Sequence, residues 1–146
     1  MRGLIIAATA ACALLVTAAA LGGGSGGAVF IQLKTQHHSG ITGTATLTPK
    51  GKSFTVKLVL QGSKAKLAND YLAHIHNVTC AKYAAIQGVN AQYATVKTTL
   101  TPVSHGTSDS AVAGPLAADL TGGLSINVHK ATGVFPTILC GDLPKR

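Results

Sequence analysis

Residues 54–60 read Phe-Thr-Val-Lys-Leu-Val-Leu, and every second side chain from Phe54 to Leu60 is apolar. Successive side chains of a β-strand point to opposite faces, so the apolar set shares one face and the residues between lie on the other. Turn-forming Pro, Gly and Ser residues occur just before this stretch, at 49–51, and just after it, at 61–63. The pattern predicts a half-buried β-strand bounded by turns.

Short segments with the same alternation recur along the chain, and helical periodicity is not sustained beyond residue 28. Strands with one apolar face each must stack as two sheets or close into a barrel. We therefore predict an all-β fold, a Greek-key flattened barrel or sandwich of about eight antiparallel strands, immunoglobulin-like in architecture. Residues 81–92 are compatible with a short helix or an irregular loop. The predicted strands are 29–33, 44–48, 54–60, 71–77, 93–103, 108–113, 124–129 and 137–140.

The first residues differ in composition from the rest of the chain. Arg2 supplies a positive charge, residues 3–21 form an uncharged Ala-rich run, and three alanines end at residue 20. This predicts a signal peptide over 1–20, a flexible Gly/Ser-rich spacer over 21–27 and one folded domain over 28–146. The alternative is an uncleaved N-terminus that tethers the protein to a membrane. Because the run is only weakly hydrophobic, we favour cleavage and a secreted, periplasmic or extracellular location.

The chain is basic but sparsely charged. Its 146 residues carry 12 Lys and Arg against 4 acidic residues, a formal net charge of +8, and charged residues make up only 11% of the total. That low fraction excludes a disordered polyelectrolyte. The lysines are spread singly from Lys34 to Lys145, whereas nucleic-acid binders cluster them, so nucleic acid is not an expected partner. The charge instead predicts attraction of small anions. The oligomeric state is left open.

Removal of residues 1–20 leaves two cysteines, Cys80 and Cys140. An even pair in an exported protein predicts one disulfide, with a free or metal-binding thiol pair as the alternative. The bridge would close a loop of about 60 residues and stabilise the fold by ~4 kcal/mol in the chain-entropy model.

Histidines supply the candidate chemistry. Residues 73–76 read Ala-His-Ile-His, so the strand period places His74 and His76 on one face and their apolar neighbours on the other. Two adjacent imidazoles can chelate a metal, and copper(II) binds such ligands most tightly among the divalent first-row ions. His129 ends the run 124–129, whose apolar residues take the core face. We therefore predict three histidines on outer strand faces, where a metal can join them outside the core. Three unrelated surface histidines are the alternative.

The other polar residues give weaker signals. His105 precedes Gly106 and is interpreted as a solvated turn residue or, alternatively, as a fourth metal ligand. His37 and His38 lie in a predicted hairpin loop. The aspartates are too dispersed for paired-carboxylate catalysis, and no Ser-His-Asp grouping or phosphate-binding glycine loop occurs.

In their order along the chain, several segments resemble the copper/zinc superoxide dismutase family. The resemblance covers essentially residues 28–146. It implies an eight-stranded Greek-key barrel, copper bound by His74, His76 and His129, and a disulfide between Cys80 and Cys140. The segments that carry it are AVFIQLK at 28–34, GTATL at 43–47, AHIH at 73–76 with Cys80 close behind, NVHK at 127–130 and CGD at 140–142.

The resemblance fails in the loop after His76. The family carries its bridging histidine and zinc ligands there, but residues 80–104 contain no His, Asp or Glu, so no zinc site of the family type is expected. The arginine that the family places before its C-terminal cysteine is also missing. The resemblance thus implies a secreted copper-binding, superoxide dismutase-like protein with weak dismutation of superoxide at most. The alternative is a non-catalytic binding or structural module on the same fold, similar to a chordin-type repeat domain.

Overall fold

The structure is a computed structural model that describes residues 27–131 and 136–146. The predicted signal peptide over 1–20, and the spacer up to residue 26, lie outside the described residues. Among the helices of the described part, none is long and apolar enough to cross a bilayer.

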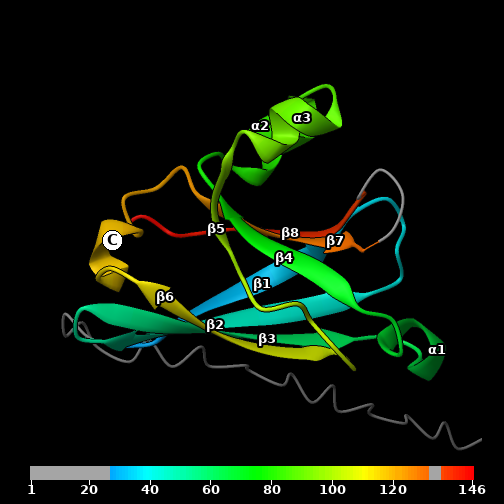
Figure 1. The fold of residues 1–146 in the computed structure, drawn as a ribbon, viewed down its shortest axis with the longest axis horizontal. Coiled ribbons are helices and arrows are strands. Elements are labelled where there is room, and N and C mark those ends of the chain that lie inside the picture. Colours follow the sequence, from blue (N-terminus) through cyan, green and yellow to red (C-terminus); the bar gives the residue numbers. More distant parts are fainter. Residues whose placement is uncertain (1–26, 132–135) are drawn as a thin grey trace, which may run out of the picture.

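Eight antiparallel strands form one continuous ladder in the order β5-β4-β7-β8-β1-β2-β3-β6 (Figure 1). The all-β prediction is confirmed. Because β3 neighbours β6, and β4 neighbours β7, the chain crosses over the ends of the barrel as in a Greek key. The strands are β1 (Val29–Thr35), β2 (Thr42–Lys50), β3 (Ser53–Gln61), β4 (Tyr71–His76), β5 (Val96–Thr99), β6 (Thr107–Ala113), β7 (Ser125–Lys130) and β8 (Thr137–Asp142).

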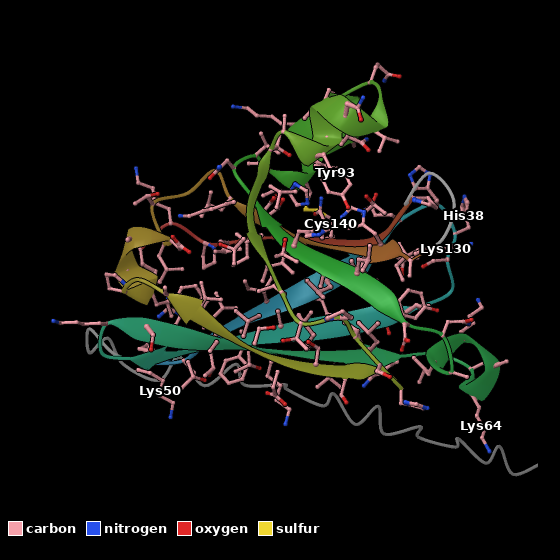
Figure 2. All side chains as sticks on the ribbon, viewed as in Figure 1. His38, Lys50, Lys64, Tyr93, Lys130 and Cys140 are labelled. Carbon is pink, nitrogen blue, oxygen red and sulfur yellow. A yellow bond between two sulfur atoms is a disulfide. The ribbon has the colours of Figure 1, made fainter. Side chains whose placement is uncertain are left out.

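The flattened barrel has two layers. One contains β1, β2, β3 and β6, and the other contains β4, β5, β7 and β8; they join where Lys34 and Thr35 of β1 pair with Cys140 and Leu139 of β8. The core lies between the layers and includes fully buried side chains from both. Figure 2 shows Lys50 and Lys64 projecting from well-separated parts of the surface, in keeping with the dispersed lysines of the sequence.

The ladder's two edge strands, β5 and β6, are linked by side chains rather than by a strand ladder. Beyond β5 the chain continues past Thr101. The hydroxyl of Ser108 donates to the Thr101 carbonyl at 2.7 Å, and the Thr101 amide donates to the Ser110 hydroxyl at 2.9 Å. These bonds nearly close the barrel. A tight turn then leads into β6 through His105 and Gly106, both with positive φ, so His105 occupies a turn as predicted.

Within residues 27–131 and 136–146, four short helical segments interrupt the strands: α1 (Lys64–Leu67), α2 (Cys80–Ala85), α3 (Val89–Tyr93) and the 3₁₀ turn η1 (Leu116–Ala118). The segment 81–92, left undecided by the sequence, forms α2 and α3. The strand predicted over 93–103 was wrong at both ends, because Tyr93 still belongs to α3 and β5 runs only from Val96 to Thr99, with Val103 forming an isolated bridge to Tyr71. Figure 1 shows α2 and α3 outside β4 and β7, on the side away from β2 and β3.

The disulfide joins the start of α2 to β8. Cys80 and Cys140 are bridged, with 5.9 Å between their Cα atoms and a sequence separation of 60 residues. The Cys80 amide also donates to Oδ1 of Asp142 at 2.6 Å. The hydroxyl of Thr79 caps the first turn of α2 by accepting from the Lys82 amide at 3.3 Å. The predicted pairing is therefore present, and it fixes the helical segment against the second layer.

Candidate metal centre

Two neighbouring strands bring the three predicted histidines together. In the β4–β7 ladder, His129 lies opposite Leu72 and His74 lies opposite Asn127. Residues paired in this way share a face of the sheet, so His74, His76 and His129 all leave the second layer on the same side. One ring nitrogen of each histidine lies within 4.8 Å of those of the other two. The three side chains thus form a group that could hold one metal ion.

Irregular pairing occurs at two of these histidines. The register of β4 against β5 shifts between Ile75 and His76, and that of β7 against β8 shifts between Val128 and His129. Such bulges increase the local twist and redirect side chains. Here they occur where His76 and His129 turn toward His74, and the ring centroids of the three pairs are 5.3, 5.6 and 5.7 Å apart.

The predicted exposure of the histidines was wrong. They do lie on the face opposite the hydrophobic core, but only 6% of His74, 1% of His76 and 2% of His129 is exposed. The reason is that α2 and α3 fold back over this face of β4 and β7 (Figure 1). A strand's own periodicity indicates which residues avoid the core, but it does not reveal a second layer of cover.

Threonine hydroxyls contact the Nδ1 atoms of two histidines. Nδ1 of His76 lies 2.8 Å from Oγ1 of Thr95, and Nδ1 of His129 lies 3.3 Å from Oγ1 of Thr137. Within the described residues, Nε2 of His76 is buried without a hydrogen-bond partner. A buried polar atom of this kind is costly unless something satisfies it. A metal ion among the three rings would do so, which makes the site fit a metal.

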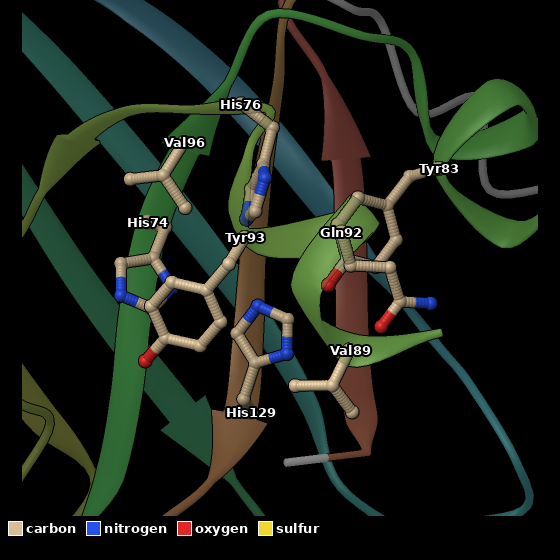
Figure 3. Close-up of a pocket in the computed structure, with 8 residues that line it drawn as sticks. All are labelled: His74, His76, Tyr83, Val89, Gln92, Tyr93, Val96 and His129. Atoms are coloured by element: carbon tan, nitrogen blue, oxygen red, sulfur yellow. The ribbon is translucent and has the colours of Figure 1, made fainter. Parts of the chain in front are cut away.

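Two tyrosines form walls of the site (Figure 3). The ring of Tyr83, from α2, lies 4.6 Å from that of His76 and 5.8 Å from that of His129, measured between centroids. The ring of Tyr93, from α3, lies 5.9 Å from that of His74. Tyr83 is buried, whereas Tyr93 is 48% exposed. Tyr93 therefore marks the side of the site nearest to solvent.

The cavity between these rings has a volume of about 10 Å³ and is also lined by Val89, Gln92 and Val96. That is close to the minimum that one water molecule needs. A larger cavity of about 380 Å³ lies beside it and reaches His37 and the disulfide. Tyr83, Val89 and Gln92 line both cavities. These three side chains therefore form a partition between a small inner chamber and a wider outer one.

The surroundings favour the neutral form of His74 and His76. Burial lowers the pKa of His74, and burial together with the nearby His129 and His74 lowers the pKa of His76 to about 3. Neutral imidazole is the form that binds metals. Burial also raises the pKa of the Tyr83 hydroxyl, an effect that a hydrogen bond with Thr137 partly offsets. The site therefore offers lone pairs, without a carboxylate in the group of three histidines.

The other histidines predicted as candidates lie elsewhere. His105 is exposed in the turn before β6 and does not belong to the group of three, and His37 and His38 are exposed in left-handed backbone conformations with φ of 48° and 50°. Sequence reasoning missed Tyr83 and Thr95, because neither stands in a motif. Their proximity to the histidines depends on how α2 and α3 fold back over the sheet.

No protein-family model, curated protein or solved structure matches the chain. The functional argument therefore depends on the geometry of the site. Three imidazoles are a donor set that suits copper, zinc, iron and nickel, and three protein ligands leave a coordination position open.

Proposed function

We propose that this is an exported copper-binding protein that holds one ion through His74, His76 and His129 and acts on a small anion in the manner of a superoxide dismutase. The observation that carries the proposal is the convergence of three buried histidines whose ring nitrogens lie within 4.8 Å of one another. The resemblance of residues 28–146 to the dismutase family supports the same ligand set.

The choice of copper follows from the donors. The group contains imidazole nitrogens without a carboxylate, and Cys80 and Cys140 are bonded to each other, so no thiolate from them is available. An all-imidazole set favours copper(II) over the other divalent first-row ions. The disulfide is compatible with the oxidising compartments in which an exported protein works.

The fold would make the site selective for small ligands. Bound copper would supply one-electron redox chemistry. The chain's own residues would hold the ion, and the buried ring of Tyr83 would keep bulk water away from it. The inner volume of about 10 Å³, close to that of a single water molecule, excludes large ligands and favours very small ones such as superoxide. The net charge of +8 would favour anions in general.

The second candidate is a binding module on the same fold without turnover. The small volume of the inner cavity favours it, because Tyr83 and the α2–α3 segment restrict approach to the histidines. The group of three histidines also includes no acidic side chain that could deliver a proton to a reduced product.

Titration of the metal-free protein with copper(II) and zinc(II) tests the shared part of both candidates. We expect one equivalent of copper to bind more tightly than zinc, and the double variant His74→Ala/His129→Ala to lose this binding. His105→Ala is the matched control, because His105 is exposed and outside the group. Binding weaker than millimolar, or unchanged binding in the double variant, would contradict the proposal.

Superoxide consumption by the copper-loaded protein separates the two candidates. Turnover well above that of free copper, and abolished by a chelator, supports the dismutase. Turnover no faster than that of free copper supports the binding module.

A further inference from the structure

Thr95 occupies the junction between the helical cover and the strand beside the metal centre. It follows α3 and precedes β5. Its amide donates to the Gln92 carbonyl at 3.1 Å, and its carbonyl accepts from the Asn77 amide, next to His76, at 2.8 Å. The backbone amide and carbonyl of Thr95 are thus both held by hydrogen bonds, and its side chain lies against the His76 ring.

The hydroxyl of Thr95 has one proton, and the structure shows where it goes. Oγ1 donates to the Gln92 carbonyl at 2.7 Å, and a carbonyl has no proton of its own to give. The contact of 2.8 Å between Oγ1 and Nδ1 of His76 must then be donated by the imidazole. We infer that Thr95 is a positioning residue: it fixes His76 as the Nδ1–H tautomer and leaves the lone pair on Nε2, directed at the metal centre.

The buried state of Nε2 agrees with this assignment. A proton on Nε2 would be a buried donor without a partner in the part of the chain that the structure describes. A buried donor without a partner is destabilising. With the opposite tautomer, the single proton of the Thr95 hydroxyl could serve either Nδ1 of His76 or the Gln92 carbonyl but not both, and the proton on Nε2 would be unsatisfied. Both effects favour the same nitrogen as the metal ligand.

Thr95 also connects the helical segment α2–α3 to the His76 ring. The carbonyl that receives the Thr95 proton belongs to Gln92, whose side-chain amide donates to the Ile86 carbonyl at 3.2 Å in the segment between α2 and α3. Gln92 also lines the inner cavity. A chain of hydrogen bonds thus runs from Ile86 through Gln92 and Thr95 to His76. The folding of α3 over the site sets the tautomer of a residue on β4.

The tautomer can be read directly in the metal-free protein, independently of any metal. In long-range ¹H–¹⁵N spectra at neutral pH, we expect His76 to show a protonated Nδ1 and an unprotonated Nε2. The Thr95→Ser variant keeps the hydroxyl and should retain this pattern, whereas Thr95→Val should give a mixture of the two tautomers. A protonated Nε2 in the unmodified protein, or an unchanged tautomer in Thr95→Val, would overturn the inference.

The effect on metal binding rests on the proposed function. Loss of a group that orients a ligating histidine typically weakens metal binding by about 10–100-fold. We expect that loss in copper(II) titrations of Thr95→Val, with Thr95→Ser close to the unmodified protein. Thr98→Val, which changes a half-buried threonine on β5, the strand that follows Thr95, is the control.

The two kinds of failure are distinguishable. Absence of copper binding in the unmodified protein would contradict the proposed function, while the spectra of His76 would still decide the role of Thr95. Equal copper affinities for Thr95→Val and the unmodified protein would overturn the positioning role. If Thr95→Val does not fold, the tautomer of the unmodified protein and of Thr95→Ser remains decisive.

Discussion

The ring of Tyr83 packs nearly edge-on against the ring of His76, with centroids 4.6 Å apart and planes at 67°. One ring comes from a helix of six residues and the other from a core strand. The contact converts an outward-facing histidine into a buried one. The metal centre is therefore built by two layers of structure, since β4 and β7 supply the ligands and α2 supplies their cover.

Removal of the Tyr83 ring should open the site. Tyr83→Phe keeps the ring and loses the hydrogen bond with Thr137, so we expect a loss of about 1 kcal/mol in the free energy of unfolding. Tyr83→Ala leaves a cavity beside His76 and should cost about 3 kcal/mol or more. It should also raise the pKa of His76 toward 6.5, because burial is the main cause of its low value. Urea unfolding and NMR titration of His76 measure the two effects, and equal results for both variants would argue against this role of Tyr83.

Copper should stabilise the native protein by binding to it. At a free copper concentration 100 times the dissociation constant, the gain is about 2.7 kcal/mol. We expect a matching rise in the thermal midpoint of the unmodified protein and of His105→Ala. His129→Ala should show little rise, because one of the three ligands is missing. An equal rise in His129→Ala would place the bound metal somewhere else.

The metal-free protein should lose stability as the pH falls below neutral. The pKa of His76 is about 3 in the folded state, against 6.5 as the ordinary value that applies when the chain is unfolded. Between these values the unfolded state binds more protons, so the stability is fully present above pH 6.5 and decreases steadily toward pH 3. The slope from this histidine approaches about 1.4 kcal/mol per pH unit.

Urea unfolding across this range measures the slope. His76→Gln, which removes the titrating ring, should show a shallower dependence on pH. The same slope in this variant would assign the effect to other groups.

The disulfide should stabilise the whole fold and also hold the helical segment α2–α3 over the histidines. Cys80→Ser/Cys140→Ser frees the start of α2 from β8 and should lower the free energy of unfolding by about 2–5 kcal/mol. Hydrogen exchange should increase more in α2 and α3 than in β2 and β3, since only the helical segment is attached at that point. Uniform acceleration throughout the chain would contradict this local effect. Reduction of the unmodified protein should reproduce the result.

Gly141 should be intolerant of any side chain. A Cβ at this position would lie 2.7 Å from Cγ2 of Ile31, 2.8 Å from Cδ2 of Leu33 and 3.0 Å from the Gln32 carbonyl oxygen. Because one of these atoms belongs to the backbone, β1 and β8 would have to separate. We expect Gly141→Ala to cost about 1–3 kcal/mol. Gly27→Ala, where a Cβ meets nothing within 4 Å, is the control and should be neutral in the same unfolding measurement.

The sequence predicted the strands well where period-two alternation was strong. The segment 54–60 lies within β3, and the faces assigned to His74, His76 and His129 are correct with respect to the core. These features depend on local geometry, which the side-chain pattern records directly. The same local rule brought His74 and His129 onto one sheet face without any knowledge of the β4–β7 register.

The cover and its contacts could not be predicted in this way. Helices α2 and α3 have six and five residues, too few to show an amphipathic period or to be stable alone. They form because the disulfide and the packing of Tyr83 hold them against the second layer. The burial of the histidines and the role of Thr95 follow from that long-range packing, which leaves no pattern in the sequence.

The hydrogen bonds that join Thr101 to Ser108 and Ser110 affect whether two copies of the protein can associate through their sheet edges. A sheet edge with free amides and carbonyls is a template on which another polypeptide can add a strand. Here the hydroxyls of Ser108 and Ser110 already occupy the carbonyl and the amide of Thr101. At this point the barrel is therefore shielded from intermolecular β-sheet growth by two small side chains of its own, next to Pro102, which has no amide proton to offer.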